Sequence, residues 1–397
     1  MPGTVASFDL PSKKRKTMKT GSWVASLLFG MAALAAPAQA QGIPKFEVDP
    51  AWPKQLPKGY VFGPSGGVTV DAKGHIWVYS RPTQLRIAIN DPPTESSGVP
   101  APSVIELTPD GSFVRGWGGK LAMSKAELAQ FDWPIQEHGI ALDRKNRVWV
   151  CGNGRDPEGE KAGRSREDNQ CIVFTADGKF VMQIGKAGQN KGSLDMQNLG
   201  RPSQPFYWAK PNEMFISDGY GNRRVVVLDA DTGKFKRMWG AYGKMPDDSY
   251  PRYRVYTPVQ QQFNLLHGMA ISLDGTVYVA DRNANRVQAF TLDGKFINEG
   301  LVAPGSPMTG NGSAFGVAFS GDSEQRFLYI ADGHNQKIRV LDRKSLKEIH
   351  GSAFGRIGLG NGQLANIHVI ANDAAGNLYI GDGGGRFQKF VFKGLSK

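Results

Sequence analysis

Three of the six histidines share one position relative to an aromatic residue that follows them. Each lies 11 residues before a Trp or Tyr, and the pairs are His138 with Trp149, His267 with Tyr278, and His368 with Tyr379. Three imidazoles that converge on one point and leave a coordination position open form a catalytic zinc site. The alternative is that each histidine is a polar residue hydrogen-bonded to water. The repeated spacing favours a metal, and zinc is the cofactor we expect.

A second set of polar residues follows the aromatic positions. Arg81 lies four residues after Trp77, Arg282 four after Tyr278, Tyr220 five after Phe215, and His334 five after Tyr329. Two guanidinium groups beside a metal suit a substrate that carries a carboxylate. A tyrosine beside them can act as a general base. The alternative is that the arginines only join neighbouring structural units.

Six copies of one sequence pattern must position these residues. Each copy has an apolar strand, a turn, an aromatic-rich strand that ends in a small residue or Asp, and a third strand. The copies begin at Gly66, His138, Pro211, His267, Phe315 and His368. Such repeats predict an all-β fold, a six-bladed β-propeller. The three histidines begin the innermost strands of copies two, four and six, so they should meet on the axis of the ring.

The same pattern predicts where the second set lies and how the ring closes. Because neighbouring strands run antiparallel, the end of each second strand returns to the start of the first. Arg81, Tyr220, Arg282 and His334 should therefore reach the rim that holds the histidines. The last copy stops after its third strand, near Phe392, and an N-terminal strand from Lys45 can complete it. Residues 41–397 are expected to form one domain.

Several other residues are assigned structural roles. Asp218, Asp281, Asp332 and Asp382 recur at a strand end and should accept backbone N–H bonds in the turn that follows. The pairs Asp110-Gly111, Asp177-Gly178, Asp274-Gly275 and Asp293-Gly294 suit tight hairpin turns. His75 and His350 fall in turns and are expected to be solvated. Residues 82–102, 153–169 and 243–262 are insertions in the repeat pattern, and we expect them to form loops around a functional face.

The two cysteines leave two interpretations open. Cys151 ends one strand-like run and Cys171 opens the next, so a hairpin could bring them together. In an exported chain such a pair is expected as a disulfide. The alternative is two buried thiols.

The first 40 residues resemble an export signal. Basic residues up to Lys19 precede an apolar run from Trp23 to Ala36, and Ala38-Gln39-Ala40 gives a cleavage site before Gln41. A start at Met18 would give a conventional signal peptide. The apolar run is too short to span a bilayer, so we expect a periplasmic or secreted protein without stable membrane insertion. Reading the basic run as a nuclear signal is the weaker alternative.

Composition excludes other classes of protein. The chain has 397 residues, of which 50 are Gly and 24 are Pro, and this argues against a helical bundle. The net charge of +12 falls to +8 over the 357 residues after the signal. Such a mild positive bias does not predict a nucleic-acid partner. We also expect the protein to be a monomer.

The repeats and the candidate site residues together resemble those of a known family. The repeats resemble NHL repeats, and the region from about Gly66 to Asp382 is similar to the peptidyl-α-hydroxyglycine α-amidating lyases, which are six-bladed zinc propellers. The matching segments are "GVTVDAKGHIWVYSR", "HGIALD", "FISDGYGNRRVVVLD", "VADRNANRVQAF" and "YIGD". The resemblance implies that His138, His267 and His368 hold zinc. It also implies that Tyr220 is catalytic and that Arg81 and Arg282 are active-site arginines.

Two positions depart from that family. The family has an Asp directly after its third histidine, used for a structural calcium, and this chain has Val369 there. That difference puts the calcium in doubt. The family also has a cysteine after its catalytic tyrosine, where this chain has Gly221, so that disulfide is absent.

The resemblance implies a function. It predicts an exported zinc lyase that cleaves the C–N bond of an α-hydroxyglycine-type substrate, a small molecule or peptide with a carboxylate, into an amide and glyoxylate. One alternative is a non-catalytic NHL-repeat propeller that binds a protein or glycan. Another is a propeller hydrolase such as a lactonase, although such sites usually rest on acidic calcium ligands, and histidines favour a softer metal.

Overall fold

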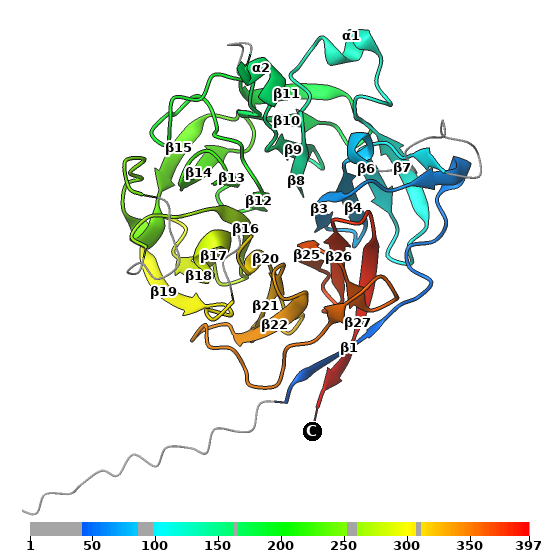
Figure 1. The fold of residues 1–397 in the computed structure, drawn as a ribbon, viewed down its shortest axis with the longest axis vertical. Coiled ribbons are helices and arrows are strands. Elements are labelled where there is room, and N and C mark those ends of the chain that lie inside the picture. The colour runs from blue at the N-terminus through cyan, green and yellow to red at the C-terminus, as the bar shows by residue number, and fades with distance from the viewer. Residues whose placement is uncertain (1–41, 86–97, 162–165, 252–259, 307–310, 397) are drawn as a thin grey trace, which may run out of the picture. The chain divides into compact units, whose positions relative to one another are not determined.

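The predicted β-propeller is confirmed. The computed structural model describes residues 42–85, 98–161, 166–251, 260–306 and 311–396, and the compact unit that contains them begins at Gly42. Six antiparallel sheets stand around a central axis as blades (Figure 1). Each innermost strand contacts the innermost strands of the two neighbouring blades, around the ring and back to the first. The proposed signal segment, residues 1–40, lies outside the described residues.

The first three blades follow one another along the chain. Blade 1 contains β3 (Ser65–Val70), β4 (Ile76–Ser80), β6 (Val104–Leu107) and β7 (Phe113–Trp117). Blade 2 contains β8 (Glu137–Leu142), β9 (Val148–Gly152), β10 (Gln170–Phe174) and β11 (Phe180–Gly185). Blade 3 contains β12 (Pro205–Trp208), β13 (Glu213–Asp218), β14 (Arg224–Asp229) and β15 (Phe235–Trp239).

The other three blades complete the ring. Blade 4 contains β16 (Leu266–Ile271), β17 (Val277–Asp281), β18 (Arg286–Phe290) and β19 (Phe296–Leu301). Blade 5 contains β20 (Ala314–Phe319), β21 (Phe327–Asp332) and β22 (Lys337–Asp342), and isolated bridges to Glu348 and Phe354 extend its outer edge. Blade 6 contains β25 (Ile367–Asn372), β26 (Leu378–Asp382), β27 (Phe387–Leu395) and β1 (Pro44–Val48).

Short elements lie in the connections between these strands. Two parallel pairs are β2 (Tyr60–Val61) with β5 (Val99–Pro100), and β23 (Arg356–Ile357) with β24 (Gln363–Leu364). The helices are α1 (Lys125–Leu128) and α2 (Pro157–Lys161), with 3-10 turns at Pro57–Gly59, Pro82–Gln84, Ala241–Gly243 and Arg282–Ala284. No helix in the described part of the chain is long and apolar enough to cross a membrane.

The N-terminal strand closes the ring, as the sequence predicts. β1 pairs antiparallel with β27, with Phe46 opposite Phe392 and Val48 opposite Phe390. Phe46 also packs against blade 5, with ring centroids 5.5 Å from Tyr329 and 4.9 Å from Phe354. The closing strand therefore joins blade 6 through backbone hydrogen bonds and blade 5 through side chains.

Blade 3 begins earlier than the sequence pattern predicts. Its innermost strand is β12, and Pro211 lies in the turn between β12 and β13. The sequence of β12 is "PFYW", which lacks the small and apolar alternation of the other innermost strands. The pattern match therefore began at the second strand of this blade.

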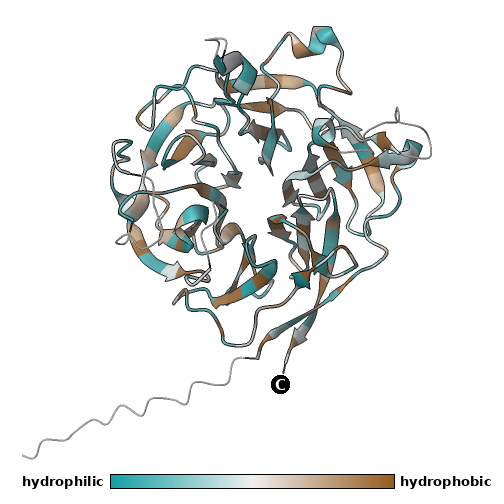
Figure 2. Cartoon of the chain, viewed as in Figure 1, coloured by the Kyte–Doolittle hydropathy of each residue, from teal (hydrophilic) through white to brown (hydrophobic). Residues whose placement is uncertain are grey.

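The core lies between the blades. Six clusters of buried apolar side chains fill the interfaces, one for each pair of neighbouring blades. Figure 2 shows hydrophobic residues along the strands of every blade. Trp77 and Trp149 are fully buried, and their indole Nε1 atoms donate to Asp71 Oδ2 at 3.1 Å and Asp143 Oδ2 at 2.9 Å. Burial of each large side chain stabilises the fold by about 1.5–3 kcal/mol.

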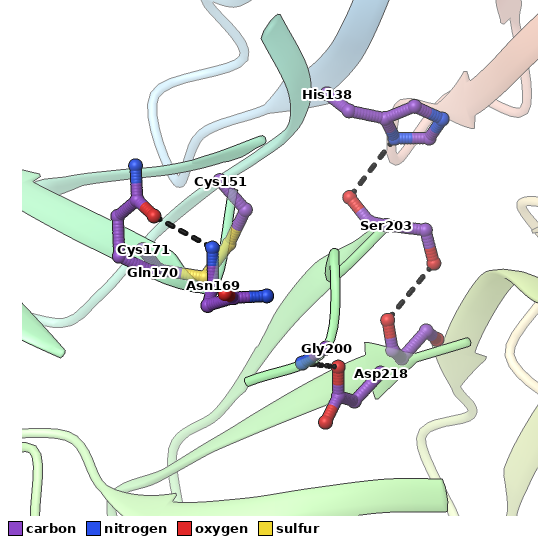
Figure 3. The surroundings of a disulfide bond; sticks show 9 residues. His138, Cys151, Asn169, Gln170, Cys171, Gly200, Ser203 and Asp218 are labelled. Carbon is purple, nitrogen blue, oxygen red and sulfur yellow. Dashed lines mark hydrogen bonds between the residues drawn. A yellow bond between two sulfur atoms is a disulfide. The ribbon is translucent and has the colours of Figure 1, made fainter. Parts of the chain in front are cut away.

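The two cysteines form a disulfide. Cys151 of β9 and Cys171 of β10 are opposite one another in the sheet, with Cα atoms 4.1 Å apart. The disulfide joins the two middle strands of blade 2, and Cys151 pairs with His138 of the neighbouring strand β8 (Figure 3). The structure therefore supports a disulfide and not two buried thiols.

The recurring aspartates are structural, and each holds a buried or partly buried arginine. The ion pairs are Asp218 with Arg224, Asp281 with Arg286, Asp332 with Arg339, and Asp382 with Arg386. Asp382 also accepts backbone N–H bonds in the following turn, as predicted. Asp281 instead accepts from the loop that enters its blade, with Asn264 N and Leu265 N both 2.9 Å from Oδ1.

The Asp281→Ala variant is expected to lower the free energy of unfolding by about 3 kcal/mol or more, because it removes the fully buried carboxylate of the ion pair with Arg286 and leaves the more exposed Glu299 as that guanidinium's remaining carboxylate partner. Asp281 is fully buried and Arg286 is 2% exposed. The matched control is Asp293→Ala, whose side chain is 91% exposed, and it should change the unfolding free energy by no more than about 0.5 kcal/mol. Equal effects in urea titrations of the two variants would refute a special role for the buried aspartates.

Candidate active site

The three histidines of the repeat pattern meet on the axis of the propeller. The Nε2 atom of His267 lies 3.2 Å from that of His138 and 3.1 Å from that of His368. Every pair of rings has centroids 4.8 Å apart and planes inclined by 76°–78°. The arrangement therefore has nearly threefold symmetry, as expected for residues from blades 2, 4 and 6.

A bulge at the start of each innermost strand aims these side chains. The pairing register shifts between His138 and Ile140, between Leu266 and Gly268, and between Ile367 and Val369. A bulge bends the strand and redirects a side chain. Gly139 has φ +78°, and a Cβ atom there would lie 1.9 Å from the carbonyl oxygen of Ser203. Only glycine permits this approach of blade 2 to blade 3.

Hydrogen bonds to neighbouring blades fix two of the rings. Nδ1 of His138 donates to Ser203 O at 3.1 Å (Figure 3), and Nδ1 of His267 donates to Phe315 O at 2.8 Å. These bonds place the proton on Nδ1 and leave a lone pair on Nε2. Burial lowers the pKa of all three histidines well below the usual range, and nearby positive charges lower it further. Neutral imidazoles are the form that binds a metal.

The predicted tyrosine and arginines lie beside the histidines. The hydroxyl of Tyr220 is 3.2 Å from His138 Nε2 and accepts a hydrogen bond from Arg282 Nη1 at 3.1 Å. Asn311 holds Arg282 through its backbone and side-chain oxygens at 2.6 and 2.7 Å. Arg81 is buried and donates from Nε to Glu137 O at 2.8 Å. Burial lowers the pKa of both arginines.

A cavity of about 430 Å³ opens over this cluster. Its lining includes Tyr220, His368 and four arginines, Arg81, Arg155, Arg201 and Arg282. A second cavity of about 710 Å³ shares Arg81 and Asn366 with it and is otherwise lined by uncharged residues. Anions are therefore favoured next to the three imidazoles.

Some site residues have no counterpart in the sequence prediction. Phe315 of blade 5 occupies the repeat position of the histidines, and the guanidinium of Arg282 stacks on its ring at 4.0 Å from the centroid. The "FGVAF" segment matches "HGIAL" and "HGMAI", so repeat phase could have identified it. Asn311, Arg155 and Arg201 come from loops, which carry no repeat signal.

The predictions about the other three histidines have different outcomes. His334 lies in the turn after β21, at the end of blade 5 where β20 begins, and it is not among the described residues that line the cavity. His75 is half-buried rather than solvated, and its Nδ1 is 2.6 Å from Glu106 Oε1. It follows the Asp71 turn in the position that Arg147 occupies after Asp143, so it belongs to the packing of its blade. His350 is exposed, as expected.

The insertions contribute to this end of the ring in part. Arg155 of the second insertion and Thr83, Gln84 and Leu85 of the first line the two cavities. Residues 86–97, 162–165 and 252–259 of the three insertions lie outside the described part of the chain. The described segments support the prediction that loops surround the functional face.

The fold and the repeats define a class of protein, a six-bladed β-propeller with NHL repeats. The NHL repeat family matches residues 263–290, which include His267 and Arg282. The chain is 26% identical over 306 residues to NHL repeat-containing protein 3 of Mus musculus, covering 75% of this chain and 70% of that protein.

Other proteins to which the chain is similar carry enzyme names. A probable peptidyl-alpha-hydroxyglycine alpha-amidating lyase of Caenorhabditis elegans is 23% identical over 249 residues, covering 61% of this chain and 60% of that protein. Among solved structures, a streptogramin B lyase is similar over 88% of this chain and 98% of that one, with 14% identity and a TM-score of 0.48.

Proposed function

We propose that this propeller is a zinc-dependent lyase that cleaves the C–N bond of an α-hydroxyglycine-type substrate and releases an amide and glyoxylate. The observation that carries the proposal is the convergence of three neutral imidazole Nε2 atoms, 3.1–3.2 Å from one to the next, beside a tyrosine and two arginines. The similarity to the amidating lyase of Caenorhabditis elegans supports it.

The three histidines fit a zinc ion. The lone pairs on Nε2 of His138 and His267 face each other at 3.2 Å and repel one another, and a shared cation removes that repulsion. His138, His267 and His368 would hold the zinc, with a fourth position open toward the cavity. When bound, zinc polarises a substrate oxygen. Among the described residues, the other group able to hold a metal is Asp71, His75 and Glu106, and it lies in the packing of blade 1.

The arginines bind and orient the substrate. Arg81 and Arg282 flank the imidazoles, and each can donate two parallel hydrogen bonds to a carboxylate. Because Asn311 and Phe315 hold Arg282, and Glu137 O holds Arg81, both guanidiniums are fixed before the substrate arrives. Fixed cations stabilise the charge that develops in the transition state at no cost in reorganisation.

Tyr220 moves the proton. In its phenolate form its Oη is positioned to take the proton of the substrate hydroxyl, and the positive charge of Arg282 at 3.1 Å stabilises that phenolate before the transfer and after the proton is returned. The carbon–oxygen double bond of glyoxylate forms as the C–N bond breaks and its electrons move to nitrogen. The released amide needs one proton on that nitrogen, so Tyr220 can return the proton it took, and the reaction consumes none overall.

The test is glyoxylate release from N-benzoyl-α-hydroxyglycine by the purified protein. The proposal requires one molecule of glyoxylate for each molecule of benzamide, and requires a chelator to abolish the reaction. If the protein contains zinc but does not convert this substrate or a peptide substrate, the proposed substrate class is wrong.

A non-catalytic binding propeller is the second candidate. NHL repeat-containing protein 3 matches over a larger share of the chain than the lyase does, and this observation favours it. A binding propeller has no need of three converging imidazoles. Elemental analysis therefore separates the candidates, since a metal-free protein that binds a partner would support the second.

We also propose export to the periplasm or outside the cell, with signal peptidase cleavage leaving Gln41 as the first residue. The order of basic stretch, apolar run and Ala38-Gln39-Ala40 is the reason. Mass spectrometry of the mature protein checks this expectation. A mature chain that still contained Trp23 to Ala36 would contradict it, and a cleavage-blocked Ala40→Arg variant is the control.

A further inference from the structure

The cavity above the histidines has more cationic groups than one carboxylate requires. Two of the four arginines, Arg81 and Arg282, flank the imidazoles and serve the first carboxylate in the proposed reaction. The other two, Arg155 and Arg201, line the same cavity. None of its described lining residues is an Asp or Glu. The two outer guanidinium groups are therefore in place to attract a second anionic group, although they share the carboxylate of Glu167 behind them.

The two outer arginines are held in place by the protein. Arg155 Nε lies 3.0 Å from Glu167 Oε1, and Arg201 Nε lies 3.8 Å from the same atom. An antiparallel bridge between Arg155 and Glu167 closes the base of the blade 2 insertion. Arg201 also donates from Nη2 to Tyr220 O at 2.8 Å. Groups fixed in this way lose little conformational entropy when they bind a ligand.

Asn153 adds a polar group to the same cavity. It is 7% exposed, it lines the cavity, and among the described residues its Oδ1 atom has no hydrogen-bond partner. Its backbone N–H donates to Gln136 O at 3.1 Å, which fixes its position. A buried acceptor without a partner costs free energy, and the N–H of a bound amide would supply the missing bond.

Apart from Arg81, which both cavities share, the arginines line only the first of the two cavities. The adjoining cavity shares Arg81 and Asn366, and its other lining residues are Pro64, Thr83, Gln84, Leu85, Gly383 and Gly384. A neutral acyl group would gain nothing from the side that carries Arg155 and Arg201, whereas an anionic one would be attracted to it. The asymmetry therefore distinguishes substrates by the charge of the acyl part.

We propose that the acyl part of the substrate carries a second carboxylate, which Arg155 and Arg201 bind, so that these two arginines determine specificity. The assignment of this ligand to a substrate rests on the lyase function proposed above. The chemical class is an N-acyl-α-hydroxyglycine whose acyl group is acidic, such as a dicarboxylic acyl group or a peptide with an acidic residue before the hydroxyglycine.

The experiment compares two unreactive ligands by calorimetry on the purified, metal-containing protein. N-succinylglycine and N-butyrylglycine have acyl chains of equal length, and they differ by one terminal carboxylate. The wild type is expected to bind N-succinylglycine about tenfold more tightly, the scale of one hydrogen bond to a charged group. N-glutarylglycine, one methylene longer, covers a different separation of the two carboxylates.

The variants assign the preference to residues. Arg155→Gln should reduce the ratio of the two affinities to about twofold or less, and Arg155→Lys should retain part of it because the charge remains. The matched control is Arg144→Gln, since Arg144 is also about half exposed and pairs with a carboxylate, Asp231 at 2.6 Å, but follows the far end of β8. Its ratio should equal that of the wild type.

Two outcomes overturn the inference. One is that neither dicarboxylate binds more tightly than N-butyrylglycine, and the other is that the preference survives in Arg155→Gln. Failure of the lyase proposal has a different signature. In that case neither N-butyryl- nor N-succinyl-α-hydroxyglycine yields glyoxylate, while the binding preference persists and depends on Arg155. Such a result would support the anion subsite and contradict the proposed reaction.

Discussion

Replacing His267 with alanine is expected to weaken zinc binding by more than about 100-fold, so that the purified variant contains little metal. Even residues that only orient metal ligands cost about 10- to 100-fold in affinity when they are changed, and a direct ligand should cost more. His267 is the most informative position because its Nε2 lies 3.2 Å from His138 Nε2 and 3.1 Å from His368 Nε2. The measurement is elemental analysis, followed by titration with a chelator that competes for zinc.

The control for this variant is His350→Ala, which removes an exposed histidine and should leave about one zinc per chain. Circular dichroism of both variants shows whether the propeller is intact. Retention of zinc by His267→Ala would contradict the assignment of the metal ligands. So would the absence of any transition metal from wild-type protein purified without chelators.

The fold was predictable because repeats carry information at three levels. The copies give the number of blades, the position of a residue within its copy gives its place along the axis, and the copy number gives its direction around the ring. His138, His267 and His368 agree at all three levels, and the structure brings them together. Ring closure by β1 was predictable for a related reason, since the last copy lacked its outer strand.

The innermost strand of blade 3 is the part of the fold that the repeat pattern did not predict. This strand, Pro205–Trp208, has no residue pattern in common with the "HGIAL" type of strand. Its position comes from backbone pairing with β13 and from packing between blades 2 and 4, and neither leaves a local sequence signal. The site residues that depend on such contacts, including Ser203, were therefore not predicted.

Residues supplied by loops were the other gap. Arg155, Arg201 and Asn311 reach the cavity through turns whose conformation depends on partners distant in sequence, such as Glu167 for Arg155. His334 was assigned to the rim by its spacing from Tyr329, but a turn residue after a strand can point in many directions. Arg81, Tyr220 and Arg282 also follow the ends of their strands, and their spacing did predict that they line the cavity. Spacing therefore identifies the end of the blade, and local contacts decide which side chains enter the cavity.

The Tyr220→Phe variant is expected to reduce kcat on an N-acyl-α-hydroxyglycine by about 100-fold or more while retaining zinc, because it removes the proposed general base. Phenylalanine keeps the aromatic ring, which packs 5.3 Å from the His138 ring centroid and 5.9 Å from that of His267. Only the hydroxyl is lost, together with its contacts to His138 Nε2 and Arg282 Nη1. Substrate binding through Arg81 and Arg282 should persist, so KM should change much less than kcat.

The matched control is Tyr207→Phe, which removes a hydroxyl in the same blade. That hydroxyl bonds to Asn212 Oδ1 at 3.0 Å, and Tyr207 lines a separate cavity, formed by residues such as Val70, Leu142 and Ile271 at the far ends of the innermost strands. Its kcat should equal that of the wild type. If Tyr220→Phe and Tyr207→Phe are equally active, Tyr220 is not the general base and the substrate proton goes to another acceptor. The remaining rate enhancement would then come from the arginines and the metal, and Arg282 would be the residue whose loss is most costly.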